Sequence, residues 1–314
     1  MRSYTLAAPA KINLHLEIIG DRPDGFHELV MILQSVALCD RVTLRAIGSQ
    51  TLRVRCDHPL VPNDESNLAH RAATLMCDQF PKAFNQFGGV EILVDKAIPV
   101  GAGLAGGSTN AAAVLVGLNL MWNLGLTHGD IQDLGAFLGS DVPFCVTGGT
   151  AIGTGRGERL DFLPKADSLW VVLAKYRSLS VSTVWAYKTY RQQFSDTYVS
   201  DEGMVGDRQQ QLHSGPLVSA LIHHNPQNVG ELIYNDLEKV VLPAHETVAH
   251  LKAEMQKLQP LGVMMSGSGP TVFALTETQA EAEALKQSIE TTLNDDDLDL
   301  WVTQFIPQGI HVID

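Results

Sequence analysis

The sequence predicts an α+β protein of two domains, and three observations support this prediction. The chain has 314 residues, a length typical of two domains of ordinary size. An alternating apolar–polar pattern near its start predicts a half-buried strand. Its second half contains patterns for a strand, helices, a strand pair, a helix and a last strand, typical of a small antiparallel sheet backed by helices. A boundary is expected at residues 163–168, which divides the chain into domains 1–163 and 164–314.

The expected elements alternate between strands and helices along the chain. Residues 4–19 form the first strand, with Ala10, Ile12, Leu14, Leu16 and Ile18 on one face and the polar residues from Lys11 to Glu17 on the other. Further strands are expected at 29–47, 51–56, 89–95, 144–153, 158–162, 169–174, as a pair within 262–275, and at 300–305. Helices are expected at 66–79 with Ser66 as N-cap, and at 108–124, 130–138, 181–194, 227–239, 243–258 and 277–291. The polar stretch 195–216 is expected to be a mobile loop.

Composition excludes several classes of function. A formal net charge of -13 argues against nucleic acid or an anionic membrane as partner, because both require a positive field. Any phosphate ligand must then be bound by local devices such as backbone amides, a few lysines and Mg²⁺. The four cysteines have no C-x-x-C spacing, so we expect reduced thiols in a cytoplasmic protein. The sequence has no signal-peptide pattern and no apolar run of ~18 residues.

The most informative segment is glycine-rich and directly precedes an alanine-rich helix. Its residues are Pro99, Val100, Gly101, Ala102, Gly103, Leu104, Ala105, Gly106, Gly107, Ser108 and Thr109. Unpaired amides and the positive end of the helix dipole would make this turn a polyphosphate site, and the hydroxyls of Ser108 and Thr109 could cap the helix or contact Mg²⁺. Two alternatives stay open: a tight turn without a ligand, and a dinucleotide-binding G-x-G-x-x-G loop. A Walker A loop is excluded, because no Gly-Lys-Ser/Thr occurs.

Two further positions suit phosphoryl transfer. Lys11 and Asn13 project from one face of the first strand, although a strand lysine taken alone is usually just solvated. Asp141 precedes Val142-Pro143 and is expected on an extended turn, where an Asx turn is the plain alternative. An aspartate beside a lysine could receive a hydroxyl proton while the cation steadies the transferred group.

A second glycine segment spans residues 265–270. It predicts a backbone nest between two strands, with a simple hairpin turn as the alternative. Two other polar segments are given no role in a site: residues 153–157 are interpreted as a strand connection, and residues 295–299 as a solvated acidic loop rather than a metal site.

Together the segments around Lys11, the glycine-rich turn and residues 265–270 resemble the three motifs of the GHMP kinase superfamily, in order and spacing, from residue 7 to 275. The resemblance implies a ribosomal S5-like N-terminal domain, a ferredoxin-like C-terminal domain, ATP with Mg²⁺, and Lys11 and Asp141 as catalytic residues. It also implies a place near the adenine for Asn67, Leu68 and Lys96. Ala105 and Asn110 stand where the superfamily often has glycine and aspartate, but the backbone amides that carry the binding are unchanged.

Residues 24–29, Asp-Gly-Phe-His-Glu-Leu, resemble the segment with which one branch of the superfamily holds a cytosine. That resemblance implies ATP-dependent phosphorylation of the 2-hydroxyl of a cytidine diphosphate conjugate of methylerythritol, a step of non-mevalonate isoprenoid synthesis. Phe26 would stack on the base, His27 would meet its polar edge, and Tyr187 would be the second aromatic, matching better than Trp185. The other substrate contacts implied are Asn13, Asn110 and Gly267.

Two alternatives for the function remain. One is another GHMP kinase with homoserine or a mevalonate derivative as acceptor, against which the cytosine segment argues. The other is a non-catalytic nucleotide-binding relative, against which the presence of both Lys11 and Asp141 argues. The oligomeric state is not predicted.

Overall fold

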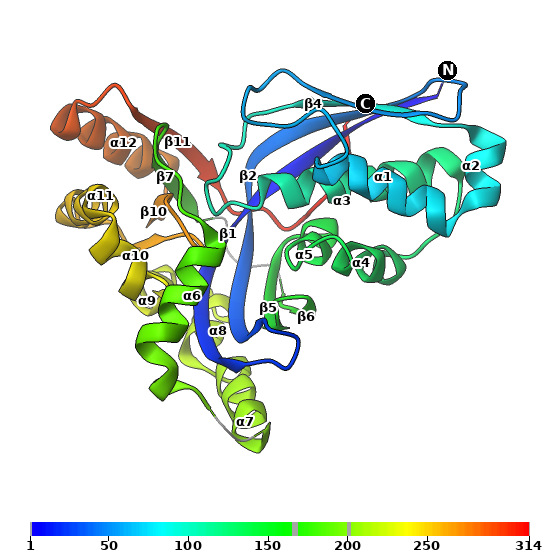
Figure 1. The fold of residues 1–314 in the computed structure, drawn as a ribbon. Helices are drawn as coiled ribbons and strands as arrows, with labels where there is room; N and C mark the ends of the chain where they lie inside the picture. Colours follow the sequence, from blue (N-terminus) through cyan, green and yellow to red (C-terminus); the bar gives the residue numbers. More distant parts are fainter. Residues whose placement is uncertain (1, 165–168, 200–201, 314) are drawn as a thin grey trace.

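Two β-sheets organise the structure, a computed structural model that describes residues 2–164, 169–199 and 202–313 (Figure 1). The first sheet follows the order β12-β1-β2-β4-β3; in addition β5 pairs with β2, β6 pairs with β5, and β8 pairs with β1. Its strands are β1 (Ser3–Asp21), β2 (His27–Ala46), β3 (Leu52–Cys56), β4 (Val90–Asp95), β5 (Thr150–Gly155), β6 (Arg159–Phe162), β8 (Tyr234–Asn235) and β12 (His311–Val312). Helices pack against it: α1 (Leu68–Gln79), α2 (Pro81–Phe87), α3 (Gly106–Trp122), α4 (His128–Ala136) and α5 (Val142–Thr147).

The second sheet is antiparallel, with the order β11-β7-β10-β9. Its strands are β7 (Trp170–Tyr176), β9 (Gly262–Met265), β10 (Val272–Thr276) and β11 (Leu298–Gln304). Its helices are α6 (Thr183–Phe194), α7 (Glu202–His213), α8 (Pro216–Ile222), α9 (Pro226–Leu232), α10 (Glu238–Ala244), α11 (Glu246–Lys257) and α12 (Gln279–Leu293), with a 3₁₀ turn at Ser195–Thr197. Helices before β9 and after β10 give the β-α-β-β-α-β order of the expected ferredoxin-like arrangement.

The two sheets share their hydrophobic cores. One cluster joins Leu16 and Met31 of the first sheet to Val172 of the second. Another joins Ile12 to Phe273 in the same way, whereas a third lies between the first sheet and the helices α1 and α3. The expected boundary at 163–168 falls mostly on residues 165–168, which lie outside the described residues. None of the described helices is both long and apolar enough to cross a bilayer.

A bulge in β1 corrects the expected strand pattern. Asn13 pairs with Leu33, but His15 pairs with Ile32, so Leu14 is an extra residue. Before the bulge Ile12 and Leu14 face one core cluster, and after it Leu16 faces another. The expectation that all five apolar residues share one face was therefore wrong, because the extra residue reverses the alternation. As a result Leu16 follows Lys11 and Asn13 on the side of the cavity described below.

Four expected elements differ from the structure. Residues 142–147 form the helix α5 rather than part of a strand, because Pro143 occupies the first helical turn, where its missing amide costs nothing. Most of the expected loop 195–216 is helical, with α7 built from good helix formers such as Gln and Arg; residues 200–201 of that loop lie outside the described residues. The expected helix 227–239 is interrupted by β8, which pairs with β1. The cap of α1 is Asn67 rather than Ser66, since the Asn67 side chain accepts from the amide of Ala69 while Ser66 donates to Asp64.

Candidate active site

A cavity of about 820 Å³ lies where the two sheets meet. It contains every predicted site residue but one: Lys11, Asn13, Phe26, His27, Asn67, Leu68, Lys96, residues 99–108, Asn110, Asp141, Tyr187 and Gly267. The exception is Thr109, which is completely buried and does not line the cavity. Its amide donates to Ala105 O (2.9 Å) as the first hydrogen bond of α3, so Thr109 belongs to the helix interior and not to the ligand surface.

The glycine-rich turn presents free amides to the cavity. Ala105 is the N-cap of α3 in the left-handed region (φ 58°), and no side chain caps the helix. The helix begins at Gly106, two residues before the expected start, and its hydrogen-bond ladder begins only at Thr109. Within the part of the chain that the structure describes, the amides of residues 106–108 have no hydrogen-bond acceptor. Together with the positive end of the dipole of a 17-residue helix, they are suited to binding an anion.

Contacts with two distant segments fix this turn. The amide of Lys11 donates to Leu104 O (3.1 Å), which ties the turn to β1. Gly103 (φ 75°) lies so close to residues 266–269 that a β-carbon there would come within 2.3 Å of Ser266 O. Ser266 Oγ donates to Gly103 O (3.2 Å). The glycine-rich turn and the second glycine segment therefore form one packed unit.

Lys11 and Asp141 lie next to each other on the wall of the cavity. Lys11 Nζ lies 3.7 Å from Asp141 Oδ2 and donates to Asn13 Oδ1 (2.7 Å). Lys11 is only 5% exposed, whereas the Asp141 side chain is about one third exposed. The expectation of an extended turn at Asp141 was wrong: its φ and ψ (−82°, −16°) are helical, and it stands at the N-cap of α5 without capping it. Its carboxylate is therefore left for the cavity.

Asp40, which sequence reasoning missed, lies beneath the turn. It is 0% exposed and forms an ion pair with Lys96, accepts from the amides of Ala97 (2.8 Å) and Ile98 (2.9 Å), and accepts from Asn110 Nδ2 (2.8 Å). Lys96 and Asn110 do line the cavity, but their polar groups are already engaged by this carboxylate. Asp40 lies far from both partners in the sequence, within an otherwise ordinary strand, and no local signal could have identified it.

Three rings on the cavity wall, those of Phe26, His27 and Tyr187, are here called the aromatic mouth. Phe26 is 51% exposed, and the ring of His27 lies 5.1 Å from that of Tyr187. Burial lowers the pKa of His27, the Asp21 carboxylate opposing this only partly, so its imidazole is neutral near pH 7. Trp185 instead packs edge-on against His245 and does not line the cavity, whereas Tyr187 does.

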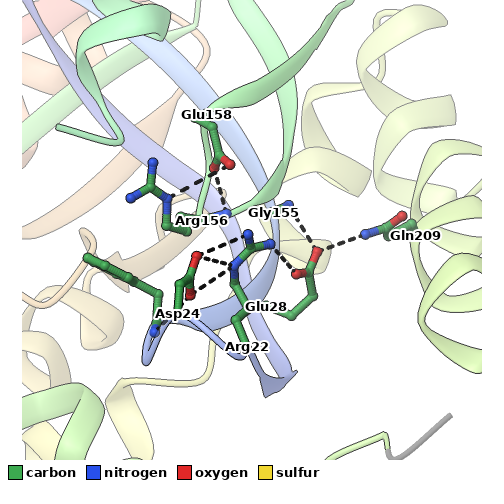
Figure 2. Close-up of polar contacts among 8 residues, drawn as sticks. Arg22, Asp24, Glu28, Gly155, Arg156, Glu158 and Gln209 are labelled. Atoms are coloured by element: carbon green, nitrogen blue, oxygen red, sulfur yellow. Dashed lines mark hydrogen bonds and ion pairs between the residues drawn. The ribbon is translucent and has the colours of Figure 1, made fainter. Parts of the chain in front are cut away.

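Arg22 and Glu28 hold the Phe26 turn in place (Figure 2). Arg22 donates to both Asp24 and Glu28. Asp24 Oδ1 accepts from the amide of Phe26 (3.1 Å). Glu28 also accepts from Gly155 N and Gln209 Nε2 (both 3.1 Å), which links the turn to β5 and to α7.

Arg156 is a second residue that sequence reasoning missed. Its guanidinium carbon lies 4.9 Å from the centre of the Phe26 ring, and the side chain lines the cavity. Its ion pair with Glu158 is long (3.8 Å). A lone arginine in a segment interpreted as a strand connection carried no signal of this position, which depends on the pairing of β5 with β2.

Comparisons with known proteins show the family of the chain. Residues 67–149 match the model of the GHMP kinases N terminal domain, and residues 217–295 match that of the GHMP kinases C terminal domain. The chain is 62% identical to a 4-diphosphocytidyl-2-C-methyl-D-erythritol kinase of Gloeothece citriformis, over 99% of both chains. It is 56% identical to the kinase of that name from Synechocystis, over 100% of this chain and 99% of the relative.

Solved structures give the same result. A crystal structure of 4-(cytidine 5'-diphospho)-2C-methyl-D-erythritol kinase matches with a TM-score of 0.73 and 29% identity, over 96% of this chain and 98% of the other. A homoserine kinase from Cytophaga hutchinsonii matches with a TM-score of 0.70 at 22% identity, over 100% of this chain and 98% of that one; it shares the fold.

Proposed function

The chain belongs to the 4-diphosphocytidyl-2-C-methyl-D-erythritol kinases of the GHMP kinase family, and from that membership we propose its reaction and its site. The enzyme transfers the γ-phosphoryl group of ATP to the 2-hydroxyl of 4-diphosphocytidyl-2-C-methyl-D-erythritol, a step of non-mevalonate (MEP) isoprenoid precursor biosynthesis. The observation that supports this proposal most is the lining of one cavity. It contains a glycine-rich turn with free amides, the Lys11–Asp141 pair, and the rings of Phe26 and Tyr187 with the neutral His27. The reduced thiols of the chain favour the cytoplasm as its compartment.

ATP is proposed to bind with its phosphates on the amides of residues 106–108. The adenine would lie against Leu68 and the exposed Leu60, both of which line the cavity. Asn67 would contact the adenine through van der Waals packing rather than hydrogen bonds, because both ends of its carboxamide are engaged. Its Oδ1 accepts from Ala69 N (2.8 Å), and its Nδ2 donates to Pro62 O (2.7 Å). Lys96 would shape the pocket rather than contact phosphate, because Asp40 neutralises it.

ATP would enter as its Mg²⁺ complex. Mg²⁺ takes one or two protein oxygens together with phosphate oxygens and waters. The Ser108 hydroxyl is an oxygen on the cavity wall and fits that requirement. When bound, the ion neutralises charge on the phosphates.

The transfer step is assigned to Lys11 and Asp141. A bond forms between the acceptor hydroxyl oxygen and the γ-phosphorus, the bond from that phosphorus to ADP breaks, and the hydroxyl proton passes to Asp141. Lys11 lies beside this carboxylate and would steady the charge on the transferred group, while Asn13 holds its ammonium in place.

The cytidine half of the acceptor is assigned to the aromatic mouth. Phe26 and Tyr187 would stack on cytosine, and the neutral His27 would meet its polar edge. The acceptor diphosphate needs a local cation because the protein carries a net charge of -13. Arg156, weakly paired and facing the cavity, suits that task.

A coupled assay of ADP release across several acceptors tests the proposal. The panel contains the cytidine acceptor, its uridine analogue, homoserine and mevalonate phosphate. We expect the cytidine compound to be preferred, because a uridine ring presents a carbonyl where cytosine presents an amine and leaves polar groups of the site unpaired. Preference for uridine or for a non-nucleotide acceptor would refute the proposed substrate and leave only the family.

The Phe26→Ala variant tests the assigned base site. Loss of base stacking is worth roughly 1–3 kcal/mol, so the acceptor KM should rise about 5- to 150-fold while the KM for ATP stays nearly constant. Phe137→Ala is the matched control, because Phe137 is 77% exposed and outside the cavity. An unchanged acceptor KM in Phe26→Ala would remove the ring from the base site.

A further inference from the structure

The second glycine segment points two backbone amides at the cavity. Ser266 N donates to Thr271 O (2.9 Å), and Gly269 N donates to Ser266 O (2.8 Å). Between them, Gly267 and Ser268 both line the cavity, and their amides have no acceptor within the part of the chain that the structure describes. Two successive free amides form a concavity suited to an oxyanion.

The direction of these amides follows from the carbonyl groups that precede them. In a planar trans peptide the C=O and the following N–H point in opposite directions. Ser266 O is turned toward Gly269 N, which directs the Gly267 amide the other way. The Ser268 amide is likewise fixed by whatever holds the carbonyl oxygen of Gly267.

Asn235 holds that carbonyl oxygen. This side chain is 3% exposed on β8, and its Nδ2 donates to both Gly267 O and Met265 O (each 2.8 Å). Its Oδ1 accepts from Leu237 N (2.9 Å), so both ends of the carboxamide are engaged. Glu238 also holds this segment, since its Oε1 accepts a hydrogen bond from Met265 N (2.8 Å).

The same segment lies beside Lys11 and its hydrogen-bond partner Asn13. A β-carbon at Gly267 would lie 3.3 Å from Asn13 Oδ1 and 3.5 Å from Lys11 Nζ. β8 also pairs with β1 at Leu16, three residues beyond Asn13. Asn235 is thus bonded to the backbone that borders the reacting groups, although it does not itself line the cavity.

We propose that Asn235 is a positioning residue for phosphoryl transfer: by holding the carbonyl of Gly267 it aims the amide of Ser268 at the oxygens of the transferred group. This inference rests on the proposed function, because it assigns the amides to the phosphoryl group. It predicts that changes at Asn235 act on kcat more than on ATP binding.

The test is Asn235→Asp, which keeps the shape and exchanges two N–H donors for a carboxyl group. As an anion the new side chain cannot donate and repels both carbonyl oxygens, so kcat should fall about 10- to 100-fold at pH 8. Burial among carbonyl groups raises the pKa of such a carboxyl, and the neutral acid can donate one hydrogen bond. The ratio of the variant's kcat to that of wild type should therefore rise several-fold as the pH is lowered from 8 to ~6. A purely structural loss would not produce this recovery.

Two controls separate an effect on catalysis from an effect on folding. Asn228→Asp makes the same chemical change at an exposed position on α9 and should leave kcat and its pH profile unchanged. Thermal melts and calorimetry with a non-hydrolysable ATP analogue give the folded, nucleotide-binding fraction to which each kcat is scaled. If Asn235→Asp folds poorly, Asn235→Ser, which keeps one donor, should show an intermediate loss per folded molecule.

Two results would overturn the inference. One is a folded Asn235→Asp enzyme with the kcat of wild type, and the other is a reduced kcat whose pH profile parallels that of wild type. The rates are measured with the acceptor that wild type turns over fastest. An unexpected acceptor would then contradict the proposed substrate without affecting the comparison at Asn235.

Discussion

Lys11 and Asp141 form an asymmetric pair. The Lys11 ammonium is enclosed and already bonded to Asn13, so its position is fixed before any ligand arrives. The Asp141 side chain is more exposed than that of Lys11. Its Oδ2 lies 3.7 Å from Lys11 Nζ, which is longer than an ordinary hydrogen bond. A fixed cation beside a carboxylate that is free to accept a proton is the division of roles that phosphoryl transfer requires.

The Asp141→Asn variant tests that division. It preserves size but removes the proton acceptor and the negative charge, so kcat should fall at least ~100-fold, the low end of what a positioned base contributes. Nucleotide affinity should stay nearly constant, because the amides proposed to bind the phosphates belong to α3. Steady-state rates and a fluorescence titration of ATP measure the two quantities.

The control for this variant is Asp133→Asn, an exposed carboxylate on α4 that lies outside the cavity. A kcat near that of wild type in Asp141→Asn would remove Asp141 from the mechanism. A parallel loss of ATP affinity would instead show that its carboxylate helps to hold the Mg²⁺ complex.

At the scale of elements, the sequence predicted well wherever local chemistry determines the structure. The glycine-rich turn and the helix after it follow from backbone freedom and a dense apolar run. The bulge at Leu14 was missed because alternation continues through it in the sequence while the strand pairing shifts. Helix α5 was missed because a proline after Asp141 fits both an extended turn and a first helical turn.

Two glycines of the glycine-rich turn should respond differently to substitution. A β-carbon at Gly107 would meet only Leu68 at 3.5 Å, an ordinary contact, so Gly107→Val should fold. Its branched side chain would nevertheless occupy the space where phosphate must approach the amides, so calorimetry with an ATP analogue should detect no binding. At Gly103, with φ 75° and Ser266 O at 2.3 Å from a β-carbon, valine should destabilise the fold itself.

A thermal melt of each variant separates the two effects. Gly107→Val should melt within a few degrees of wild type, whereas Gly103→Val should melt lower by about 5 °C or more or fail to fold. Unchanged ATP affinity in a folded Gly107→Val protein would show that this turn is not the phosphate cradle.

At the scale of the whole molecule, the cavity depends on contacts between segments that are far apart in the chain. Asp40 reaches Lys96, Arg156 reaches Phe26, and Asn235 reaches Gly267. Each of these side chains looks ordinary among its sequence neighbours, and its partner is brought to it only by strand pairing and sheet packing. For that reason the sequence predicted the residues that carry motifs but not those that position them.

The two halves of the chain are bound together by the same packing. We propose the domain division 1–163 and 164–314, although β8 and β12 return from the second half to pair with β1. Two hydrophobic clusters contain residues of both halves. Phe26 and Tyr187, proposed to hold one base between them, also come from different halves.

Because the two halves share strands and hydrophobic clusters, we expect a single cooperative unfolding transition. A ligand at the acceptor site should raise the Tm of that one transition. Cytidine 5'-diphosphate at about 100 times its Kd stabilises the folded protein by about 2.7 kcal/mol, which corresponds to a rise in Tm of about 3–8 °C. In Phe26→Ala the same concentration of cytidine 5'-diphosphate should raise Tm by at most about two thirds of the wild-type shift. The reason is that weaker binding lowers the ratio of ligand concentration to Kd. Differential scanning calorimetry measures both shifts. Two separate transitions, of which cytidine diphosphate moves only one, would show that the halves unfold independently and that the base is held by one half alone.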